Sequence, residues 1–159
     1  MKKTNFLLLA AFSSVLFVSC SSFGGSTKNK EKGNPIETSK SAVEAILADK
    51  KGNEGKRFSI TGYLNYSPGL RVYTSRPQLV FVYTEAGKKG NVTSIIEMPW
   101  EENGKNSVFT PQNAGGDGSK TIFYDNEGTA LTMNDKVIIS FSVNEEITNP
   151  TDIRIDKTQ

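Results

Sequence analysis

The pattern of apolar and polar positions divides the chain into an apolar start, a polar segment and a long region of alternating character. From Arg57 onward, the apolar residues Phe58, Ile60 and Leu64 alternate with polar neighbours. A period of two is typical of a β-strand with one buried and one solvated face. This stretch therefore predicts the first strand of a β domain, and Gly62 within it predicts a bend or bulge.

Later stretches have the same character and are separated by turn residues. Pro77 interrupts the second of them, and its apolar end from Leu79 to Tyr83 is expected to be well buried. The predicted strands after the first span residues 71–83, 92–98, 107–109, 121–124 and 136–143, with a terminal strand around Ile153 and Ile155. This succession of short strands predicts a mainly β fold.

One helix is expected before the first strand. Ser41 and Glu44 have the spacing of a capping box, in which the serine oxygen accepts a bond from a free backbone amide. Gly52 provides a stop signal, so the helix should run from about residue 41 to residue 51. Its apolar stripe at helical spacing, which should seal one end of the sheet, consists of Val43, Ile46 and Leu47.

The N-terminus has the layout of a secretory signal. Lys2 and Lys3 provide a positive start, and an almost unbroken apolar run from Phe6 to Val18 leads directly to Ser19 and Cys20. The run is shorter than the ~18 to 20 apolar residues that a membrane-spanning helix needs. A retained membrane helix is therefore the less favoured alternative.

Residues 17–20, with the sequence Phe-Val-Ser-Cys, resemble the bacterial lipobox, although Leu usually stands where Phe17 does. The resemblance implies that Cys20 becomes the mature N-terminus and carries a diacylglyceryl group and an amide-linked acyl chain such as palmitate. It also implies outer-membrane delivery, because Ser21 replaces the Asp that some Gram-negative systems use for inner-membrane retention. The alternative is a plain signal peptide with an incidental cysteine.

These features predict three regions along the chain: a lipoprotein signal peptide at 1–19, a lipidated cysteine with a flexible tether at 20–37, and a β domain at 38–159. The segment after Cys20 is rich in Ser, Gly, Lys and Asn and has few large apolar residues. Such a composition buries too little apolar surface to offset the entropy of ordering. We therefore expect it to space the domain from a membrane surface.

The amino-acid composition limits the kinds of ligand, metal site and catalytic site that this chain can form. Removing Lys2 and Lys3 from the 19 basic residues leaves 17 against 17 acidic ones, so the mature protein lacks the basic surplus of a typical nucleic-acid binder. Histidine is absent and Cys20 is the only cysteine. This removes the usual ligand sets for zinc, haem and iron–sulfur clusters, and it removes His-dependent catalytic triads. We expect no cofactor, no metal site and no catalytic site.

One enzyme class remains open as an alternative. A carboxylate-dependent hydrolase could use paired acidic groups, for which Glu97, Glu101 and Glu102 are the candidates. Sequence spacing alone fixes no distance between their carboxyl groups. This hypothesis is therefore weaker than that of a non-catalytic binding domain.

The chain from about Ser41 to Asp156 resembles an OB-fold domain of the bacterial exported group related to anticodon-binding-like OB domains. Two stretches carry the resemblance: residues 55–64, with the sequence GKRFSITGYL, and residues 134–140, with the sequence NDKVIIS. The resemblance implies a small five-stranded barrel. Asn134 replaces the usual Gly, and residues 99–120 look like an insertion. A small β-sandwich is the alternative.

OB-like folds implied by this resemblance bind extended oligomers across their second and third strands, on aromatic platforms. The corresponding candidate ligand-binding residues are Tyr63, Arg71, Tyr73, Arg76 and Trp100. Tyrosines and arginines are also common on the solvated face of a sheet, and a loop tryptophan often caps a core. These positions are candidates on the strength of the resemblance only.

Taken together, these expectations describe an envelope lipoprotein with a non-catalytic binding or interaction domain. Its partners would be the membrane, through the lipid anchor, and a protein, peptide or glycan of unknown identity. An oligonucleotide-binding module is the alternative, which a local basic groove containing Arg71 and Arg76 would favour.

Overall fold

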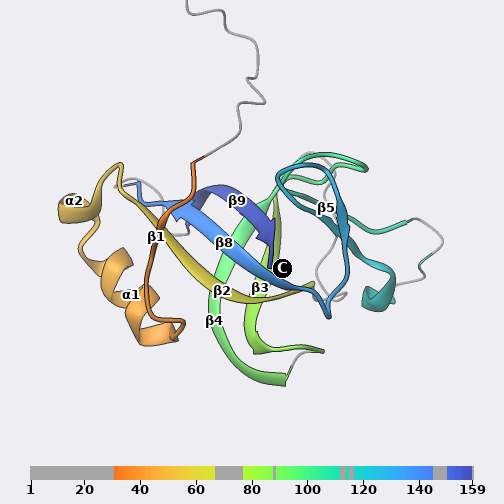
Figure 1. The fold of residues 1–159 in the computed structure, drawn as a ribbon, viewed down its shortest axis with the longest axis horizontal. Helices are drawn as coiled ribbons and strands as arrows, with labels where there is room; N and C mark the ends of the chain where they lie inside the picture. Colours follow the sequence, from red (N-terminus) through yellow and green to blue (C-terminus); the bar gives the residue numbers. More distant parts are fainter. Residues whose placement is uncertain are drawn as a thin grey trace, which may run out of the picture.

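The computed structural model describes residues 31–66, 77–87, 89–111, 114, 117–144 and 150–158 and confirms a mainly β fold. The described strands form a large sheet and a small three-stranded sheet. Figure 1 shows the large sheet in the middle of the molecule, with helices α1 and α2 at one end and the small sheet at the other. The predicted signal peptide and Cys20 lie outside the described residues.

The large sheet has the strand order β4-β3-β2-β8-β9, and each of these neighbouring pairs is antiparallel. A two-residue strand, β1, pairs in parallel with β2. The strands are β1 (Asn34–Pro35), β2 (Arg57–Tyr66), β3 (Gln78–Glu85), β4 (Lys89–Met98), β8 (Lys136–Ser142) and β9 (Thr151–Lys157).

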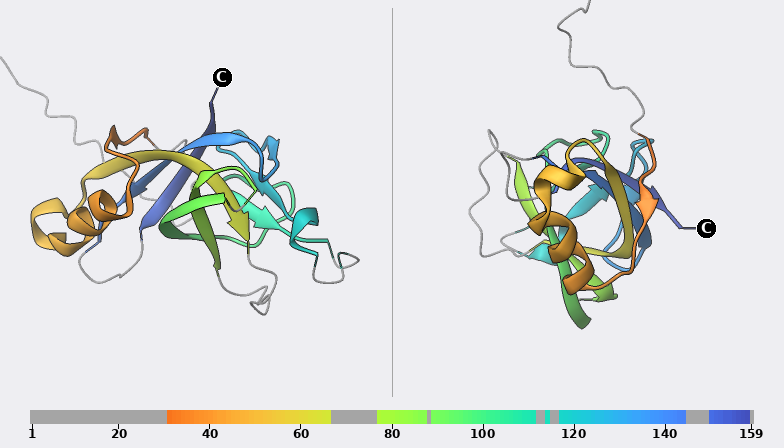
Figure 2. Two further views of the ribbon diagram at one scale, coloured as in Figure 1. Left: turned by 90° about the horizontal axis from the view of Figure 1, so that it is seen from below. Right: turned by 90° about the vertical axis from the view of Figure 1, so that its left-hand side faces the viewer.

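The pairing among the described strands is that of an open sheet rather than the closed five-stranded barrel that was expected. β4 and β9 form the two ends of the strand order, and no ladder joins them in the described ranges. The sheet is nevertheless strongly curved, and β4 and β9 come into contact (Figure 2). α1 lies in front of one open end of this curved sheet (Figure 2).

The small sheet forms within the stretch between β4 and β8. Its order is β5-β6-β7, and its strands are β5 (Ser107–Phe109), β6 (Ile122–Tyr124) and β7 (Ala130–Leu131). A short 3-10 helix, η2 (Gly118–Lys120), precedes β6. The sequence predicted β5 and β6, whereas the two-residue β7 is too short to show a period.

Both sheets contribute to one hydrophobic core. Val108, Phe123 and Leu131 of the small sheet belong to the same buried cluster as the inward residues of the large sheet and Val43 of α1. From the large sheet the cluster includes Ile60, Leu64, Val80, Val82, Ile96, Val137, Ile139, Phe141 and Ile155. The alternation predicted for β2 and β8 is thus confirmed, and it defines which side of the sheet faces the core.

The N-terminal helix begins earlier and ends earlier than the sequence predicted. α1 spans Lys40–Ala48, and its N-cap is Ser39 rather than Ser41. The Ser39 Oγ accepts a hydrogen bond from the Ala42 backbone N–H at 3.2 Å, which satisfies one of the free amides of the first turn. Asp49 then ends α1 and caps a second, four-residue helix, α2 (Lys50–Asn53).

Residues 31–36, the last part of the predicted tether, lie against β2. The Gly33 carbonyl accepts from the Ser59 hydroxyl at 3.0 Å, and the Ile36 N–H donates to the Ser59 carbonyl at 2.9 Å. The Arg57 Nε donates to the Glu31 carbonyl at 3.1 Å. These bonds fasten the start of the described chain to the first long strand. Sequence patterning missed this segment because its bonds are made by backbone groups.

A buried pair of asparagines joins the small sheet to β9. The Asn106 Oδ1 accepts from the Ile155 backbone N–H at 2.7 Å, and the Asn106 Nδ2 donates to the Asn126 Oδ1 at 3.2 Å. The Asn126 backbone N–H donates to the Ile155 carbonyl at 2.7 Å. Both asparagines are buried. Polar side chains therefore take the place of a strand ladder where the two sheets meet.

The turn before β8 holds a carboxylate whose pKa is lowered. The Asp135 side chain accepts bonds from the Lys157 ammonium at 2.7 Å and from the Thr132 backbone N–H at 2.7 Å. These bonds favour the charged form and lower the pKa of Asp135 from 3.8 to about 2. The stabilisation is fully present above the unfolded-state value of 3.8 and is lost as the pH falls through about 2.

We expect Asp135→Asn to lower the free energy of unfolding at neutral pH by about 1 kcal/mol, after allowing for solvent screening of this partly exposed pair. Urea unfolding at a series of pH values measures the difference from the wild type. The difference should shrink as the pH falls from 4 towards 2, because both proteins then carry a neutral group at this position. A difference that stays constant over this range would contradict the assignment.

Candidate functional site

The side of the large sheet that faces away from the core carries a row of large apolar and aromatic side chains. In β3, Leu79, Phe81 and Tyr83 alternate with the buried Gln78, Val80 and Val82. Alternate residues of a strand point to opposite faces, so the first three project outward. We use the name outer face for the group formed by Tyr63, Leu79, Phe81, Tyr83 and Ile95.

Strand register brings these residues together. Tyr63 of β2 lies directly opposite Tyr83 of β3, and Phe81 lies opposite Ile95 of β4. Side chains of directly paired residues lie on the same face, with Cβ atoms about 5 Å apart. Leu79 is the diagonal neighbour of Ile95, because Leu79 pairs with Glu97. The outer face is therefore continuous across three neighbouring strands.

Two of these side chains are unusually open to solvent. Leu79 is 37% exposed and Ile95 is 36% exposed, and they are the large hydrophobic residues classed as exposed in the described part of the chain. Tyr63, Phe81 and Tyr83 are half-buried. Single exposed apolar residues are common, whereas adjacent ones on one face are typical of an interaction site.

Polar side chains border the outer face. Lys136 of β8 pairs with Tyr63 at one end, and Glu97 of β4 pairs with Leu79 at the other. Asn65, which points to the same side of β2, is only 3% exposed, and its Nδ2 contacts the Met133 Sδ at 3.1 Å. The described border thus carries charges of both signs.

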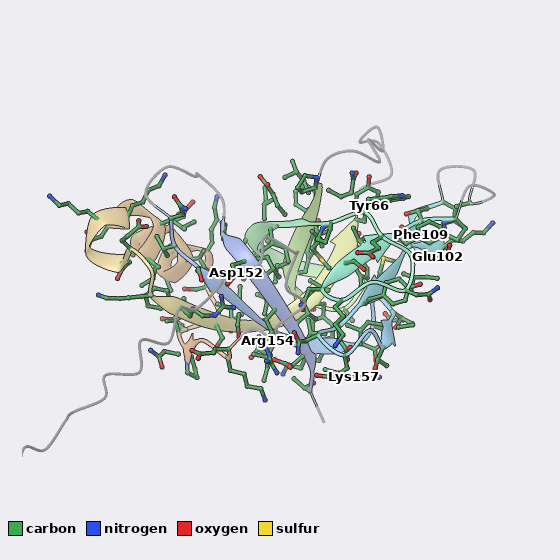
Figure 3. The ribbon with its side chains drawn as sticks, turned by 90° about the horizontal axis from the view of Figure 1, so that it is seen from above. Tyr66, Glu102, Phe109, Asp152, Arg154 and Lys157 are labelled. Carbon is green, nitrogen blue, oxygen red and sulfur yellow. The ribbon has the colours of Figure 1, made fainter. Side chains whose placement is uncertain are left out.

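A buried hydrogen bond fixes the ends of β2 and β3 next to the outer face. The Tyr66 hydroxyl donates to the Gln78 Oε1 at 3.1 Å, and both residues are buried; Figure 3 shows Tyr66 among the side chains of the sheet. Burial raises the pKa of Tyr66 above its ordinary value of 10.0. The hydroxyl therefore stays protonated near neutral pH and keeps its donor role.

Two of the five sequence-predicted site residues lie in the described part of the chain, and one of these two belongs to the outer face. Tyr63 belongs to it, as just described. Trp100 instead packs against Phe109 with ring centroids 5.4 Å apart, at the end of the molecule opposite the helices (Figure 3). Trp100 is partly buried and packs against the core cluster, and its role in ligand binding stays a prediction. Arg71, Tyr73 and Arg76 lie outside the described residues.

Sequence reasoning missed Leu79, Phe81, Tyr83 and Ile95 as surface residues. The stretch from Leu79 to Tyr83 was expected to be well buried, but only Val80 and Val82 within it are. Because both faces of β3 are apolar, the strand lacks the polar alternation that marks a solvated side. Which face of β3 is covered depends on where β3 and β4 lie in the sheet. The sequence does not reveal this position, so it could not show that Leu79, Phe81 and Tyr83 face outward.

The acidic residues considered for a hydrolase lie on two different segments. Glu97 is in β4, whereas Glu101 follows Trp100 and its backbone N–H donates to the Val108 carbonyl of β5 at 3.2 Å. Among the described residues, no three His, Cys, Asp or Glu side chains are grouped so that they could hold a metal ion. The hydrolase alternative gains no geometric support from these positions and stays untested.

The chain matches no protein-family model, no curated protein and no solved structure. Within the described ranges, no helix combines the length and apolar character that crossing a membrane requires. Function therefore has to be inferred from the outer face and its surroundings in this chain.

Proposed function

We propose that this protein is a lipid-anchored, non-catalytic binding protein of the bacterial cell envelope whose outer face holds an extended segment of a partner protein. The observation that carries the proposal is the continuous apolar and aromatic row across β2, β3 and β4. Two of its members, Leu79 and Ile95, are 37% and 36% exposed. Burying such a patch against a partner is favourable by about 25 cal/mol per Å².

The strand connections support the OB-like part of this proposal. β2, β3 and β4 follow one another along the chain and pair in that order, and β8 returns to pair with β2 on its other side. This is the Greek-key arrangement on which an OB barrel is built. In such folds the second and third strands form the ligand face, and β3 and β4 are the corresponding strands here.

The chemistry of the outer face favours a protein segment over other extended ligands. Single-stranded nucleic acids need a cationic track beside the stacking rings, yet the described border carries Lys136 at one end and Glu97 at the other. The exposed aliphatic residues Leu79 and Ile95 suit apolar side chains better than sugar hydroxyls. An oligonucleotide and a glycan are therefore the alternative outcomes.

The proposal also includes a lipid anchor at Cys20. Acylation of Cys20 would tie the chain to the outer membrane by several acyl chains, which hold a protein far more durably than one. Residues 31–36 of the predicted tether are bonded to β2, so this part of it belongs to the folded domain. Fewer residues would then separate the lipid from the folded domain than the boundary at residue 37 implies.

Site-specific crosslinking in intact cells tests the outer face. Replacing Tyr83 by p-benzoylphenylalanine places a photoreactive ring within the face, and the same replacement at Ser119, an exposed residue of η2, provides the control. We expect a protein adduct from position 83 only. Adding Leu79→Asp should abolish the adduct, whereas the size-conserving Leu79→Met should preserve it.

Two results would overturn this assignment. Adducts of equal yield from both positions, or an adduct that Leu79→Asp leaves unchanged, would show that the outer face does not select the partner. An adduct that disappears on nuclease or glycosidase treatment would replace the protein partner with an oligonucleotide or a glycan.

A further inference from the structure

Asn65 is a buried amide next to the apolar side chains of the outer face. It lies on the outward side of β2, two residues after Tyr63, and it pairs directly with Phe81 of β3. Phe81 in turn pairs with Ile95 of β4. Asn65 is only 3% exposed, whereas Phe81 is half-buried and Ile95 is exposed. A polar group is therefore buried at one end of an otherwise apolar row.

Most of the hydrogen-bonding capacity of this amide is unused. An asparagine side chain has two N–H donors and an oxygen that can accept two bonds. The Asn65 Nδ2 faces the Met133 Sδ at 3.1 Å, and a thioether is a weak acceptor. Within the described part of the chain, the Asn65 Oδ1 accepts no hydrogen bond. Every fully covered side-chain oxygen in these ranges has a partner, so this Oδ1 retains contact with solvent.

An amide with such weak partners does not help the fold. Moving an amide out of water without replacing its hydrogen bonds is unfavourable, and buried polar side chains of native proteins are usually bonded. The strand partner of Asn65, Phe81, and its contact, Met133, are both apolar, so neither requires an amide at residue 65. A position that breaks a folding rule in this way is typical of a functional site.

We propose that Asn65 is the polar recognition residue of the outer face, and that its side-chain amide pairs with the main chain of the bound protein segment. The inference rests on the proposed function, because it describes how the outer face would hold that segment. In an extended chain the N–H and C=O of one residue point to the same side. The Asn65 Oδ1 and Nδ2 could bond to both groups at once.

Met133 would move aside when the segment binds. It lies in the turn between β7 and β8, and it is partly buried. Its side chain has three rotatable bonds, and methionines adapt readily at binding surfaces. The Thr132 backbone N–H and hydroxyl both donate to the Asp135 carboxylate, which fixes the backbone on either side of Met133. The movement therefore needs only a new rotamer of one side chain.

This contact would fix the position of the segment along the outer face. Apolar contacts are not directional, whereas hydrogen bonds require a defined distance and angle. Pairing through the main chain sets one condition on the partner: the residue opposite Asn65 cannot be proline, which has no N–H. The neighbouring positions of the partner would carry apolar side chains, because they meet Phe81 and Ile95.

The test uses peptides of about ten residues, selected from a displayed random library on the purified full-length protein. Only peptides whose binding is abolished by Leu79→Asp are kept, because this dependence assigns them to the outer face. We expect Asn65→Leu to weaken their binding by about tenfold. Thr61→Val, which removes a hydroxyl from the same side of β2 but outside the outer face, should leave the affinity unchanged.

Urea unfolding separates this role from a structural one. Leucine has the same number and branching of side-chain heavy atoms as asparagine but forms no hydrogen bonds, so Asn65→Leu should unfold at the same or a higher urea concentration. The smaller Asn65→Val provides a second variant if leucine overpacks the site. An asparagine needed only for folding would instead lower the urea midpoint in both variants and leave the affinity of the folded protein unchanged.

Ester substitution in the peptide tests the main-chain bond itself. Replacing one peptide amide by an ester removes a single N–H donor and leaves the side chains intact. At one position of the peptide, the ester should weaken binding to the wild type by about tenfold but binding to Asn65→Leu by less than about twofold. Equal losses with both proteins at every position would contradict the pairing.

The two levels of the account fail in different ways. Peptides that need Leu79 yet bind Asn65→Leu and the wild type equally well would overturn the role of Asn65 and leave the outer face as the binding site. If no selected peptide depended on Leu79, the proposed function would be wrong and the inference about Asn65 would be wrong with it.

Discussion

Gly62→Val is expected to lower the free energy of unfolding by about 3 kcal/mol. A Cβ atom at Gly62 would lie 2.7 Å from the Val82 Cγ1 and 2.9 Å from the Tyr83 carbonyl oxygen. One of these neighbours is backbone, which cannot move without disturbing β3. The valine methyl groups extend the clash, so β2 and β3 would have to separate next to the outer face.

Denaturant unfolding of purified protein measures this effect, with two matched variants. Gly62→Ala adds only the Cβ and should fall between the wild type and Gly62→Val. Thr61→Val places the same valine at the adjacent, half-exposed position and should change stability by less than about 1 kcal/mol. Equal stability of Gly62→Val and the wild type would show that β3 does not approach β2 as closely as the structure has it.

Asn106→Ala is expected to lower the free energy of unfolding by a similar amount, about 3 kcal/mol, for a different reason. The change removes the acceptor of the Ile155 N–H and the donor to the Asn126 Oδ1, and it leaves both groups buried. Each orphaned polar group costs about 1 to 3 kcal/mol. The small sheet should then open before the large sheet, which faster amide hydrogen exchange at Phe123 of β6 than at Ile139 of β8 would detect.

Asn103→Ala provides the control for Asn106→Ala. Both asparagines have a positive φ, 56° at Asn103 and 50° at Asn106, so both variants lose the tolerance of asparagine for this conformation. Asn103 is exposed, whereas Asn106 is 6% exposed. The difference between the two variants therefore isolates the buried hydrogen bonds. If the two variants lost equal stability, the asparagine pair would have no role in joining the sheets.

The parts of the fold with a clear period were predictable. β2 alternates between apolar and polar residues, and β8 carries Val137, Ile139 and Phe141 on one face. Both strands were placed correctly, as was the terminal strand containing Ile153 and Ile155. β1 was missed because it consists of Asn34 and Pro35, two residues that disfavour strands, and the backbone bond beside it is donated by the next residue, Ile36, to the Ser59 carbonyl. The N-cap was misplaced by two residues because Ser39 and Ser41 both offer the required hydroxyl.

The candidate site was less predictable than the fold. Tyr63 was found because it lies on the polar side of a clearly alternating strand. Phe81 and Tyr83 were missed because β3 is apolar on both faces, so burial depends on what covers each face. The contact of Trp100 with Phe109 could not be predicted, because it depends on where β5 lies in the fold. Whether these side chains are buried depends on the neighbouring strands and on the segments that cover each face. Local sequence patterns reveal neither.

The functional account depends on the acylation of Cys20, because this modification would place the domain at the envelope. Mass spectrometry of the N-terminal peptide from full-length protein expressed in a Gram-negative bacterium tests it most directly. The account predicts a mature chain that begins at Cys20, with a diacylglyceryl group on Sγ and an acyl chain on the α-amino group. A free Cys20 thiol, or a chain that retains residues 1–19, would contradict it.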